Sequence, residues 1–420
     1  MVVRIARRLM NARRPQFIYR ASWLFKRPEP PGALHRALFF TSCNTPWLWL
    51  IQIVGFCRWI GFGAWRSSYR FSRVSTVKQL EQYGLTRLQL FGELLRFGLL
   101  YSIAPHQYAR HQLYRPDIKK CLFHFIYDHQ LPYFHHYLHR HVSGYRASVA
   151  LIADKHRFAQ TLQKKGIPTV QSQIFDTCEL KNDMTLLFQQ KTIFCKPNQG
   201  SQSKDAFLLR YYELEDRYRL EPIHGEYLHE RHDIERYLTY TLARHKQLIL
   251  QPFVQDHDEL KSELSNRAMT TVRIITAWQE TSASPVVLYL QLEIPSLRKT
   301  TARQKEKQFY TILPLHWETL DVDPVFQKKF PEIKDNMRFI PGTLKNMLRE
   351  IQSHCIKAHQ SLLNLKSVAF DVCLSQQGPV ILEANFNWSI TLLYQVIDCD
   401  PLAVDNVHPA AMWLKQLSGV

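Results

Sequence analysis

The segment of residues 367–391, SVAFDVCLSQQGPVILEANFNWSIT, holds two carboxylates and an amide in a pattern that suits metal chemistry. The β-prone stretches VAFDVCL and PVILEAN flank the turn SQQG, which predicts an antiparallel hairpin. Glu383 and Asn385 are two residues apart and share a face, and the hairpin can bring Asp371 beside them. Such hard oxygen donors suit Mg²⁺ and leave positions for phosphate oxygens and water. The alternative is a hairpin with scattered polar residues, but the ligand types favour the metal site.

A second hairpin is predicted over residues 191–210, KTIFCKPNQGSQSKDAFLLR. Two apolar stretches flank a loop of small and polar residues whose tip runs from Asn198 to Ser203. Backbone N–H groups and hydroxyls of Gly200, Ser201 and Ser203 can wrap phosphates, and Lys196 at the end of the first strand can add a cation. With one glycine, this loop is a weak phosphate-binding signal by itself.

The stretch 248–276 contains an apolar strand, LILQPFV, and an alternating strand, TTVRIITAW. Pro252 interrupts the first and suggests a hinge between lobes, where adenine can insert against backbone groups. In the second, Arg273 lies on the face opposite its neighbours Val272 and Ile274. If it is buried between lobes it requires an anion such as a phosphate or carboxylate. An arginine on a solvated edge strand is the alternative.

Residues 151–169, LIADKHRFAQTLQKKGIPT, predict a helix that starts at Asp154 and stops before Ile167. Asp154 can cap this helix, and Lys155 then stands in its first turn, where anions are attracted. A surface helix followed by a turn is the alternative reading.

The elements that must position these residues alternate between strand and helix from residue 150 onward, which is typical of an α/β or α+β enzyme domain. The chain has 420 residues with 45% hydrophobic composition, enough for two or three domains with substantial cores. Its eight cysteines are scattered without CxxC spacing. This pattern argues against a zinc knuckle or a secreted disulfide framework and favours a reducing, cytoplasmic compartment.

The net charge of +18 is concentrated near the N-terminus. Residues 1–120 hold 20 Lys and Arg against 4 Asp and Glu, whereas the other 300 residues hold 34 against 32. A basic module attracts polyanions such as lipid headgroups, nucleic acid or an acidic glycan. Residues 1–26 are rich in arginine and lack acid, so they resemble a membrane-surface arm, a transit peptide or a solvated arm. Nucleic acid is the least favoured partner, because no recognition motif accompanies the charge.

Residues 47–65, WLWLIQIVGFCRWIGFGAW, are the most hydrophobic stretch of the chain. Their length suits a membrane span, but Arg58 at mid-stretch is costly in lipid and three glycines weaken a helix. Terminal tryptophans followed by Arg66, Arg70 and Arg73 resemble interfacial anchors. A buried helix or hairpin, an interfacial element on the inner face of the cell membrane and a span all remain open. If the stretch is an interfacial element, residues 1–73 are expected to bind an anionic membrane surface.

Between residues 85 and 138 apolar residues recur at helical spacing and predict a helical subdomain. It includes a histidine-rich run in which His135 and His139 are one helical turn apart, as in a metal pair. Acidic and cysteine partners are nearly absent nearby, so a packed basic surface is favoured over a metal site.

Taken in order, the DK…GIP segment, KPNQGSQ, LILQPFVQDH…TTVRIIT and FDV…GPVILEANFNWS resemble the ATP-grasp superfamily, most closely its sugar-transfer-associated group, over residues 145–395. The resemblance implies an α+β fold of two lobes gripping ATP, preceded by a basic, mainly helical module. The implied domains are an arm (1–45), a helical module (46–145), a small lobe (146–257) and a large lobe with the metal site (258–420). The implied cofactors are ATP and Mg²⁺.

The resemblance also assigns roles to individual residues. Lys155 and Lys196 contact ATP phosphates, the loop Gly200–Ser203 closes over them, and Arg273 contacts the transferred phosphate. The remaining implied contacts are adenine near Gln251–Val254, ribose at Asp258, and metal at Asp371, Glu383 and Asn385.

Two departures from the family pattern concern the lid and the substrate side. The loop reads GSQSKD instead of a glycine-rich run, and Ser296–Phe309 is strongly basic.

The implied reaction is phosphorylation of a small-molecule or glycan-linked carboxylate and capture of the acyl phosphate by an amine, in cell-surface polysaccharide synthesis. A membrane- or polyanion-associated nucleotide-binding protein and an ATP-dependent phosphotransferase are the alternatives.

Overall fold

The computed structural model describes residue 18 and residues 30–42, 45–176, 191–200, 205–223, 227–261, 268–280, 282–298, 307–329, 340–397 and 408–418. By its contacts the chain forms two compact units, one of residues Met1–His141 with Asn387–Val420 and one of residues Val142–Phe386. The sequence places residues 387–420 in the C-terminal lobe, whereas the structure groups them with the N-terminal unit.

The regular secondary structure of the first unit, within its described residues, consists of helices. Its elements are α2 (Pro30–Ser42), α3 (Pro46–Arg58), the π-helical turn Trp59–Gly63, α4 (Ala64–Val74), α5 (Val77–Tyr83), α6 (Arg87–Tyr101), α7 (Pro105–Arg110), α8 (Pro116–Lys120), α9 (Leu131–His139) and α17 (Pro409–Ser418), with short 3-10 turns at Leu122–His124, Asp128–Gln130 and Ile390–Gln395. Two of these helices start with a capping box, in which Thr76 and Thr86 each accept a backbone N–H from the residue three positions on.

The apolar stretch 47–65 forms a helix and not a hairpin, because α3, the π-helical turn and α4 run on without a break. Thr45 caps the start and Pro46 occupies the first turn, where its missing N–H costs nothing. Within the described part of the chain, this helix is the one that is long and apolar enough to cross a membrane by length and composition alone.

Three histidines of the His-rich run, His129, His135 and His139, pack into the core of the first unit, whereas His136 and His141 are exposed. His135 is fully buried on α9, and its Nε2 donates to the carbonyl of Trp388 at 2.7 Å. Burial lowers the pKa of His135 to about 4. His139 also donates inward, from Nδ1 to the carbonyl of His135. Among the described residues no group of three His, Cys, Asp or Glu side chains has a metal-binding arrangement.

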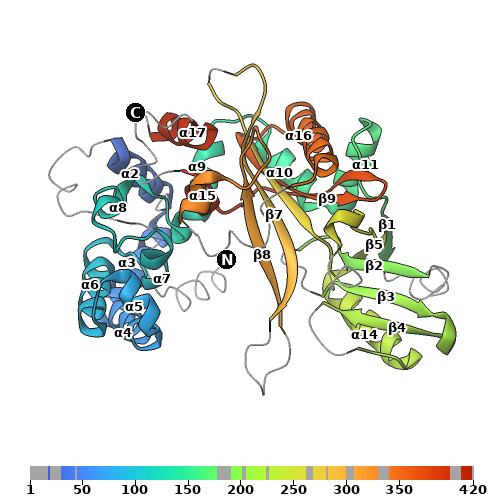
Figure 1. Cartoon of the computed structure of the whole chain (residues 1–420), viewed down its shortest axis with the longest axis horizontal. Helices are drawn as coiled ribbons and strands as arrows, with labels where there is room; N and C mark the ends of the chain where they lie inside the picture. Colours follow the sequence, from blue (N-terminus) through green and yellow to red (C-terminus); the bar gives the residue numbers. More distant parts are fainter. Residues whose placement is uncertain are drawn as a thin grey trace. The chain divides into compact units, whose positions relative to one another are not determined.

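The second unit is built on two antiparallel five-stranded sheets (Figure 1). One sheet has shorter strands in the order β1-β5-β2-β3-β4 and is called the smaller sheet. The other has longer strands in the order β10-β9-β6-β7-β8 and is called the larger sheet. The strands are β1 (Gln173–Asp176), β2 (Thr192–Pro197), β3 (Phe207–Tyr212), β4 (Arg217–Pro222), β5 (Gln247–Pro252), β6 (Thr271–Ala277), β7 (Val286–Arg298), β8 (Lys307–Leu315), β9 (Ser367–Ser375) and β10 (Gly378–Asn385). The helices are α10 (Tyr145–Ala153), α11 (Lys155–Lys164), α14 (Arg231–His245), α15 (Pro324–Lys329) and α16 (Gly342–Leu362), with 3-10 turns at Glu213–Glu215 and Asp258–Leu260. The α+β expectation is confirmed at this level.

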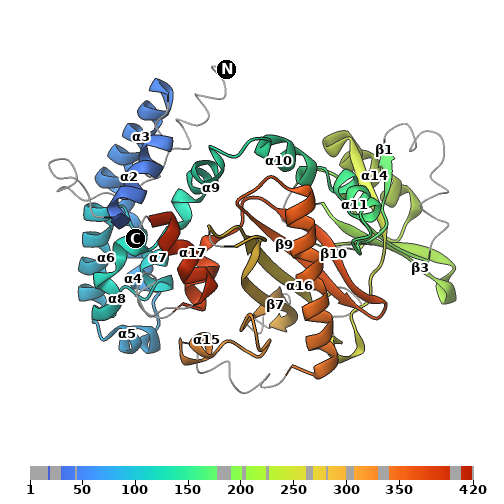
Figure 2. The same ribbon diagram turned by 90° about the horizontal axis from the view of Figure 1, so that it is seen from above.

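Helix α16 lies along one face of the larger sheet (Figure 2). Its apolar residues, among them Leu348 and Ile351, pack with Phe370 and Val372 of β9 and Ile274 of β6 into one buried core. Because side chains alternate along a strand, the residues between these apolar positions emerge on the opposite face. That opposite face carries the polar residues described below.

The smaller sheet buries one face against α14. Ile193 and Cys195 of β2 join Phe207 and Leu209 of β3 and Leu238 of α14 in this core. The alternating positions Phe194 and Lys196 therefore lie on the other face of β2.

The basic segment at Ser296–Phe309 belongs to a long hairpin. Strand β7 runs to Arg298 and β8 begins at Lys307, so both extend well past the neighbouring strand β6 (Figure 1). Residues 299–306 lie outside the described residues.

Candidate active site

A row of charged side chains crosses the larger sheet on the face away from α16. Asp371 of β9 is paired with Arg273 of β6 on one side and with Glu383 of β10 on the other. Arg273 is in turn paired with Gln291 of β7. Residues that are between 12 and 110 positions apart in the chain thus lie in one line across four neighbouring strands of the sheet.

The position of Glu383 in this row depends on a bulge in β10. Ile381 is paired with Val372 in the apolar core, and strict alternation would send Glu383, two residues on, into that core as well. The register shifts between Ile381 and Glu383, so that Glu383 is opposite Asp371 instead. A bulge of one extra residue reverses the faces that follow it. Asn385 emerges on the same polar face.

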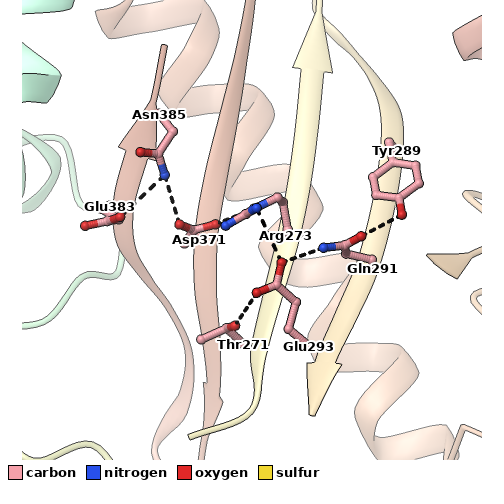
Figure 3. Close-up of polar contacts among 8 residues, drawn as sticks. All are labelled: Thr271, Arg273, Tyr289, Gln291, Glu293, Asp371, Glu383 and Asn385. Carbon is pink, nitrogen blue, oxygen red and sulfur yellow. Dashed lines mark hydrogen bonds and ion pairs between the residues drawn. The ribbon is translucent and has the colours of Figure 1, made fainter. Parts of the chain in front are cut away.

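Both oxygens of Asp371 accept hydrogen bonds (Figure 3). Arg273 donates from Nε to Oδ1 at 2.9 Å, and Asn385 donates from Nδ2 to Oδ2 at 2.9 Å. The same amide nitrogen is 3.4 Å from Oε1 of Glu383. Asp371, Glu383 and Asn385, separated by up to 14 residues in the chain, are therefore in direct contact.

Arg273 is held from its other side by Glu293 of β7, whose Oε1 lies 3.4 Å from its Nη1. Glu293 also accepts a hydrogen bond from Gln291, which accepts one from Tyr289 at 2.6 Å (Figure 3). The sequence reasoning missed these three residues. The segment LYLQLEI, with polar groups at every second position between leucines, carried the signal for a strand with one polar face.

The electrostatics of this row favour an added cation. Burial raises the pKa of Asp371 to about 6, the cation of Arg273 opposes the rise, and the charge of Glu383 adds to it. Burial works against the charge of Arg273, but Asp371, Glu293 and Glu383 outweigh it and raise the pKa of the guanidinium. Three carboxylates thus face one guanidinium across the sheet.

Lys196 of β2 approaches the row from the smaller sheet. Its Nζ is 3.9 Å from Oε2 of Glu383, and its side chain is 14% exposed. The ammonium also lies 5.8 Å from the ring centroid of Phe194. Burial lowers its pKa and Lys155 adds to that effect, while Glu383 and Asp371 oppose it. The two sheets therefore present opposite charges to each other at this point.

Lys155 is the first residue of α11, and its Nζ donates to the carbonyl of Gly200 at 2.7 Å. Asp154 caps the helix by accepting from the N–H of Arg157. Gly200 has φ of +139°, a backbone conformation that a side chain would strain. Lys155 thus touches the entry of the loop that follows β2. Ser201 and Ser203 lie outside the described residues.

Asn198, at the start of the loop after β2, is a structural contact between α11 and the smaller sheet. It is 1% exposed, and its Oδ1 accepts from the N–H of His156 at 3.1 Å. Its own N–H donates to the carbonyl of Gln247 at 3.2 Å. The side chain thereby fixes the start of α11 to β2 and β5, which positions Lys155 and Lys196 relative to each other.

The expected nucleotide-hinge residues are spread along β5 and beyond. Gln251 is buried and paired with Phe194, and Val254 follows the end of the strand. Asp258 lies next to the β9–β10 turn, where it pairs with Lys261 at 2.6 Å and accepts from Gln376 at 2.9 Å. Asp371 is four residues up β9 from Ser375 at that turn, roughly 13 Å away along the strand. Asp258 therefore does not join the charged row.

The donor set suits a hard divalent cation. Two carboxylates and an amide share one face of a stiff hairpin, and oxygen donors of this kind bind Mg²⁺. In the structure Asn385 directs its nitrogen to both carboxylates, so holding a cation requires a half-turn of the amide that presents its oxygen. With that turn the three residues fit a metal ion.

No family model and no curated protein matches this chain. Among solved structures, VanG D-Ala:D-Ser ligase from Enterococcus faecalis is similar at 12% identity and a TM-score of 0.37, over 65% of this chain and 61% of its own. D-Alanine-D-alanine ligase from Helicobacter pylori is similar at 13% identity and a TM-score of 0.38, over 64% and 61%. The ATP-grasp ligase PsnB is similar at 12% identity and a TM-score of 0.35, over 64% and 62%. The matches span about three fifths of those chains, and the likeness is loose.

Proposed function

We propose that this protein is an ATP-grasp enzyme that binds Mg-ATP and activates a carboxylate as an acyl phosphate for ligation to an amine. The observation that supports it most directly is the meeting of Lys196 from the smaller sheet with the Glu383–Asp371–Arg273 row of the larger sheet. A polyphosphate with its metal needs such a set of cations and carboxylates together. The sequence motifs that resemble the superfamily lie on these same elements.

In this proposal Lys155 and Lys196 bind the phosphates of ATP, and Gly200 with the loop after it covers them. Asp371, Glu383 and Asn385 hold Mg²⁺, which when bound neutralises charge on the phosphate oxygens. Gln251 and Val254 line the adenine side. Asp258, beside the β9–β10 turn, faces the ribose.

The chemistry has two steps. A carboxylate oxygen of the substrate attacks the γ-phosphorus while the bond to the bridging oxygen breaks, which leaves ADP and an acyl phosphate. An amine then attacks the acyl carbon, loses its proton and expels phosphate. Arg273 stabilises the charge on the transferred phosphoryl group, and Lys196 offsets charge on the leaving side. Arg273 is pre-positioned for this because Asp371 and Glu293 fix its guanidinium.

The acceptor half of the site forms a separate part of the proposal. The resemblance to the sugar-transfer-associated group supports small-molecule or glycan-linked substrates in cell-surface polysaccharide synthesis, and the basic residues 1–73 support action at the inner face of a membrane. The basic β7–β8 hairpin supports an acidic acceptor.

Trapping of the intermediate tests the proposal. The full-length protein is incubated with Mg-ATP, a panel of carboxylates and hydroxylamine, and ADP and hydroxamate are measured. Equal release of ADP and hydroxamate is expected for a true substrate, whereas ADP with a stable phosphate ester would identify a phosphotransferase and refute the ligase.

The metal assignment is tested by Glu383→Gln, which keeps the size of the side chain but removes its charge. It should lower ADP release at least 100-fold, because a metal ligand is lost. Glu235→Gln, on the exposed side of α14, is the matched control and should leave the rate unchanged. Normal turnover by the Glu383 variant would remove the metal assignment.

A further inference from the structure

Large apolar side chains gather on the outside of the first unit. Among the described residues 18 large hydrophobic side chains are exposed, and 12 of them lie between Phe40 and Leu100. The helix from Pro46 to Val74 contributes most of these. Monomeric proteins seldom expose so much apolar surface in one place, and such patches mark interaction sites.

In this helix the buried side chains are mostly small or polar and the exposed ones are large and apolar. Its buried positions are mostly small or polar, namely Gln52, Gly55, Trp59, Ala64, Ser68 and Ser72. Its exposed positions carry the large side chains instead: Trp47 is 52% exposed, Ile53 52%, Phe62 64% and Tyr69 58%. A surface helix in water shows the opposite arrangement. The exposed face therefore suits an apolar surrounding.

The π-helical turn keeps the buried positions on one side of the helix along its whole length. Buried positions recur three or four residues apart up to Trp59, and the next one, Ala64, follows after five. One extra residue in the turn makes up this difference, with the N–H of Ala64 bonding to the carbonyl of Trp59. The exposed apolar stripe consequently continues from Trp47 to Tyr69 on one side of the helix.

The second half of the helix is clamped to α6. Trp59 donates from its indole to the carbonyl of Gly98 at 2.8 Å, and Arg87 donates to the carbonyl of Arg73. Tyr69 stacks edge-on against Phe91, with centroids 6.5 Å apart. Because α6 carries charged residues of its own, this half cannot pass through hydrocarbon without taking them along.

The length of the charge-free part of the helix also argues against a membrane span. Residues 46–57 contain no charged side chain and span about 18 Å of helix, less than the roughly 30 Å of a hydrocarbon core. Arg58 follows and is exposed. The uncharged part can therefore enter one leaflet but is too short to cross both, and a span would place Arg58 in the hydrocarbon core.

The charges next to the stripe select the kind of surface. The helix holds Arg58, Arg66, Arg70 and Arg73 and no acidic residue, and all four are exposed. Exposed tryptophan and tyrosine side chains alternate with them, as in the interfacial belts of membrane proteins. Arginines in this position pair with anionic headgroups while the aromatic rings lie at the boundary between headgroups and acyl chains.

We propose that the exposed side of the helix Pro46–Val74 is a membrane-docking face that lies in one leaflet of an anionic bilayer. Its apolar stripe dips below the headgroups, and its arginines stay at their level. The proposal goes beyond the enzymatic one and does not depend on it.

Sedimentation of the full-length protein with vesicles tests this face. We expect binding to phosphatidylcholine vesicles that contain 30% phosphatidylglycerol and little binding to pure phosphatidylcholine. The triple variant Arg66→Gln, Arg70→Gln, Arg73→Gln should weaken binding about 100-fold, since each arginine near an anionic surface contributes roughly fivefold. Its control is Arg231→Gln with Arg236→Gln, which are exposed on α14.

The apolar stripe is tested by Trp47→Ser with Ile53→Ser, against a control of Leu214→Ser with Tyr240→Ser. The control residues are at least as exposed but lie in the second unit. The stripe variant should lose more than 100-fold in vesicle affinity and the control none. Equal binding by both would overturn the proposal.

Two further outcomes would also overturn it. One is a dimer in lipid-free solution that Trp47→Ser with Ile53→Ser dissociates, because the face would then bind a second copy. The other is a span, in which Thr45→Cys is protected from an impermeant maleimide outside the vesicles and reacts once a pore-former opens them. Reaction of Thr45→Cys from outside is the expected result. ADP release is measured on the same samples, so that failure of docking and failure of the enzymatic proposal are told apart.

Discussion

Replacing Arg273 with Gln tests the charged row of the larger sheet most directly. Arg273 donates to Asp371 at 2.9 Å and contacts Glu293 at 3.4 Å, and the arginine and aspartate side chains are 31% and 15% exposed. Opposite charges about 4 Å apart in such a partly buried place interact by roughly 4 kcal/mol. Removing the cation leaves Asp371 and Glu293 without the positive charge between them, although each keeps a hydrogen bond from a neighbouring amide. We therefore expect a loss of about 3–5 kcal/mol in the free energy of unfolding.

The pairwise part of this loss is measured by a double-mutant cycle with Asp371→Asn. If the ion pair supplies the effect, the double variant Arg273→Gln with Asp371→Asn should be less destabilised than the sum of the single variants by about 2 kcal/mol. Urea unfolding without nucleotide or metal gives these free energies. A spectroscopic probe in the second unit distinguishes the unfolding of that unit from the unfolding of the first unit. Additivity within about 0.5 kcal/mol would refute the coupling. In that case the two residues would merely share a strand pair.

Other predictions concern the phosphate lysines, the buried histidine and the helix clamp. Lys196→Met should weaken Mg-ATP binding about 10- to 100-fold in calorimetry, which is the effect of losing a charge-assisted hydrogen bond. Lys164→Met at the exposed end of α11 is the control and should not weaken binding. Equal affinities of the two variants would show that Lys196 does not bind the nucleotide. Burial, opposed by the bond that His35 Nε2 donates to the Phe123 carbonyl, lowers the pKa of His35 to about 4. Because this pKa lies below the ordinary 6.5, the stabilisation is complete above pH 6.5 and is lost as the pH falls. Between pH 7 and 5 His35 should lower the free energy of unfolding by about 2 kcal/mol, and His135, whose pKa is lowered equally, by about 2 kcal/mol more. A flat profile by urea titration would contradict this. Gly98→Val should destabilise the first unit by roughly 2 kcal/mol more than Gly92→Val on the same helix, because a Cβ at Gly98 lies 3.2 Å from that of Ala64 whereas Gly92 faces open space; equal melting temperatures would argue against this packing.

Local patterns in the sequence were enough for the elements that carry the site. Alternation of apolar and polar residues around the SQQG turn identified the hairpin of Asp371 and Glu383, which is strands β9 and β10. The Asp154 cap identified the start of α11, and with it the place of Lys155. These features depend on neighbours a few residues away, so the sequence shows them.

The sequence by itself determined which residues share a strand or a helix and how charge is distributed along the chain. Only the tertiary structure decided which of them meet. The bulge before Glu383, the pairing of Arg273 with both Asp371 and Glu293, and the approach of Lys196 from the other sheet all arise from strand registers, which depend on contacts between distant segments. The apolar stretch 47–65 was equally undecided, since a buried helix, an interfacial helix and a span have the same composition. In the structure Trp47, Trp49 and Trp65 are exposed, whereas Trp59 and Ala64 are buried against Gly98 of α6, a distinction that depends on packing between helices.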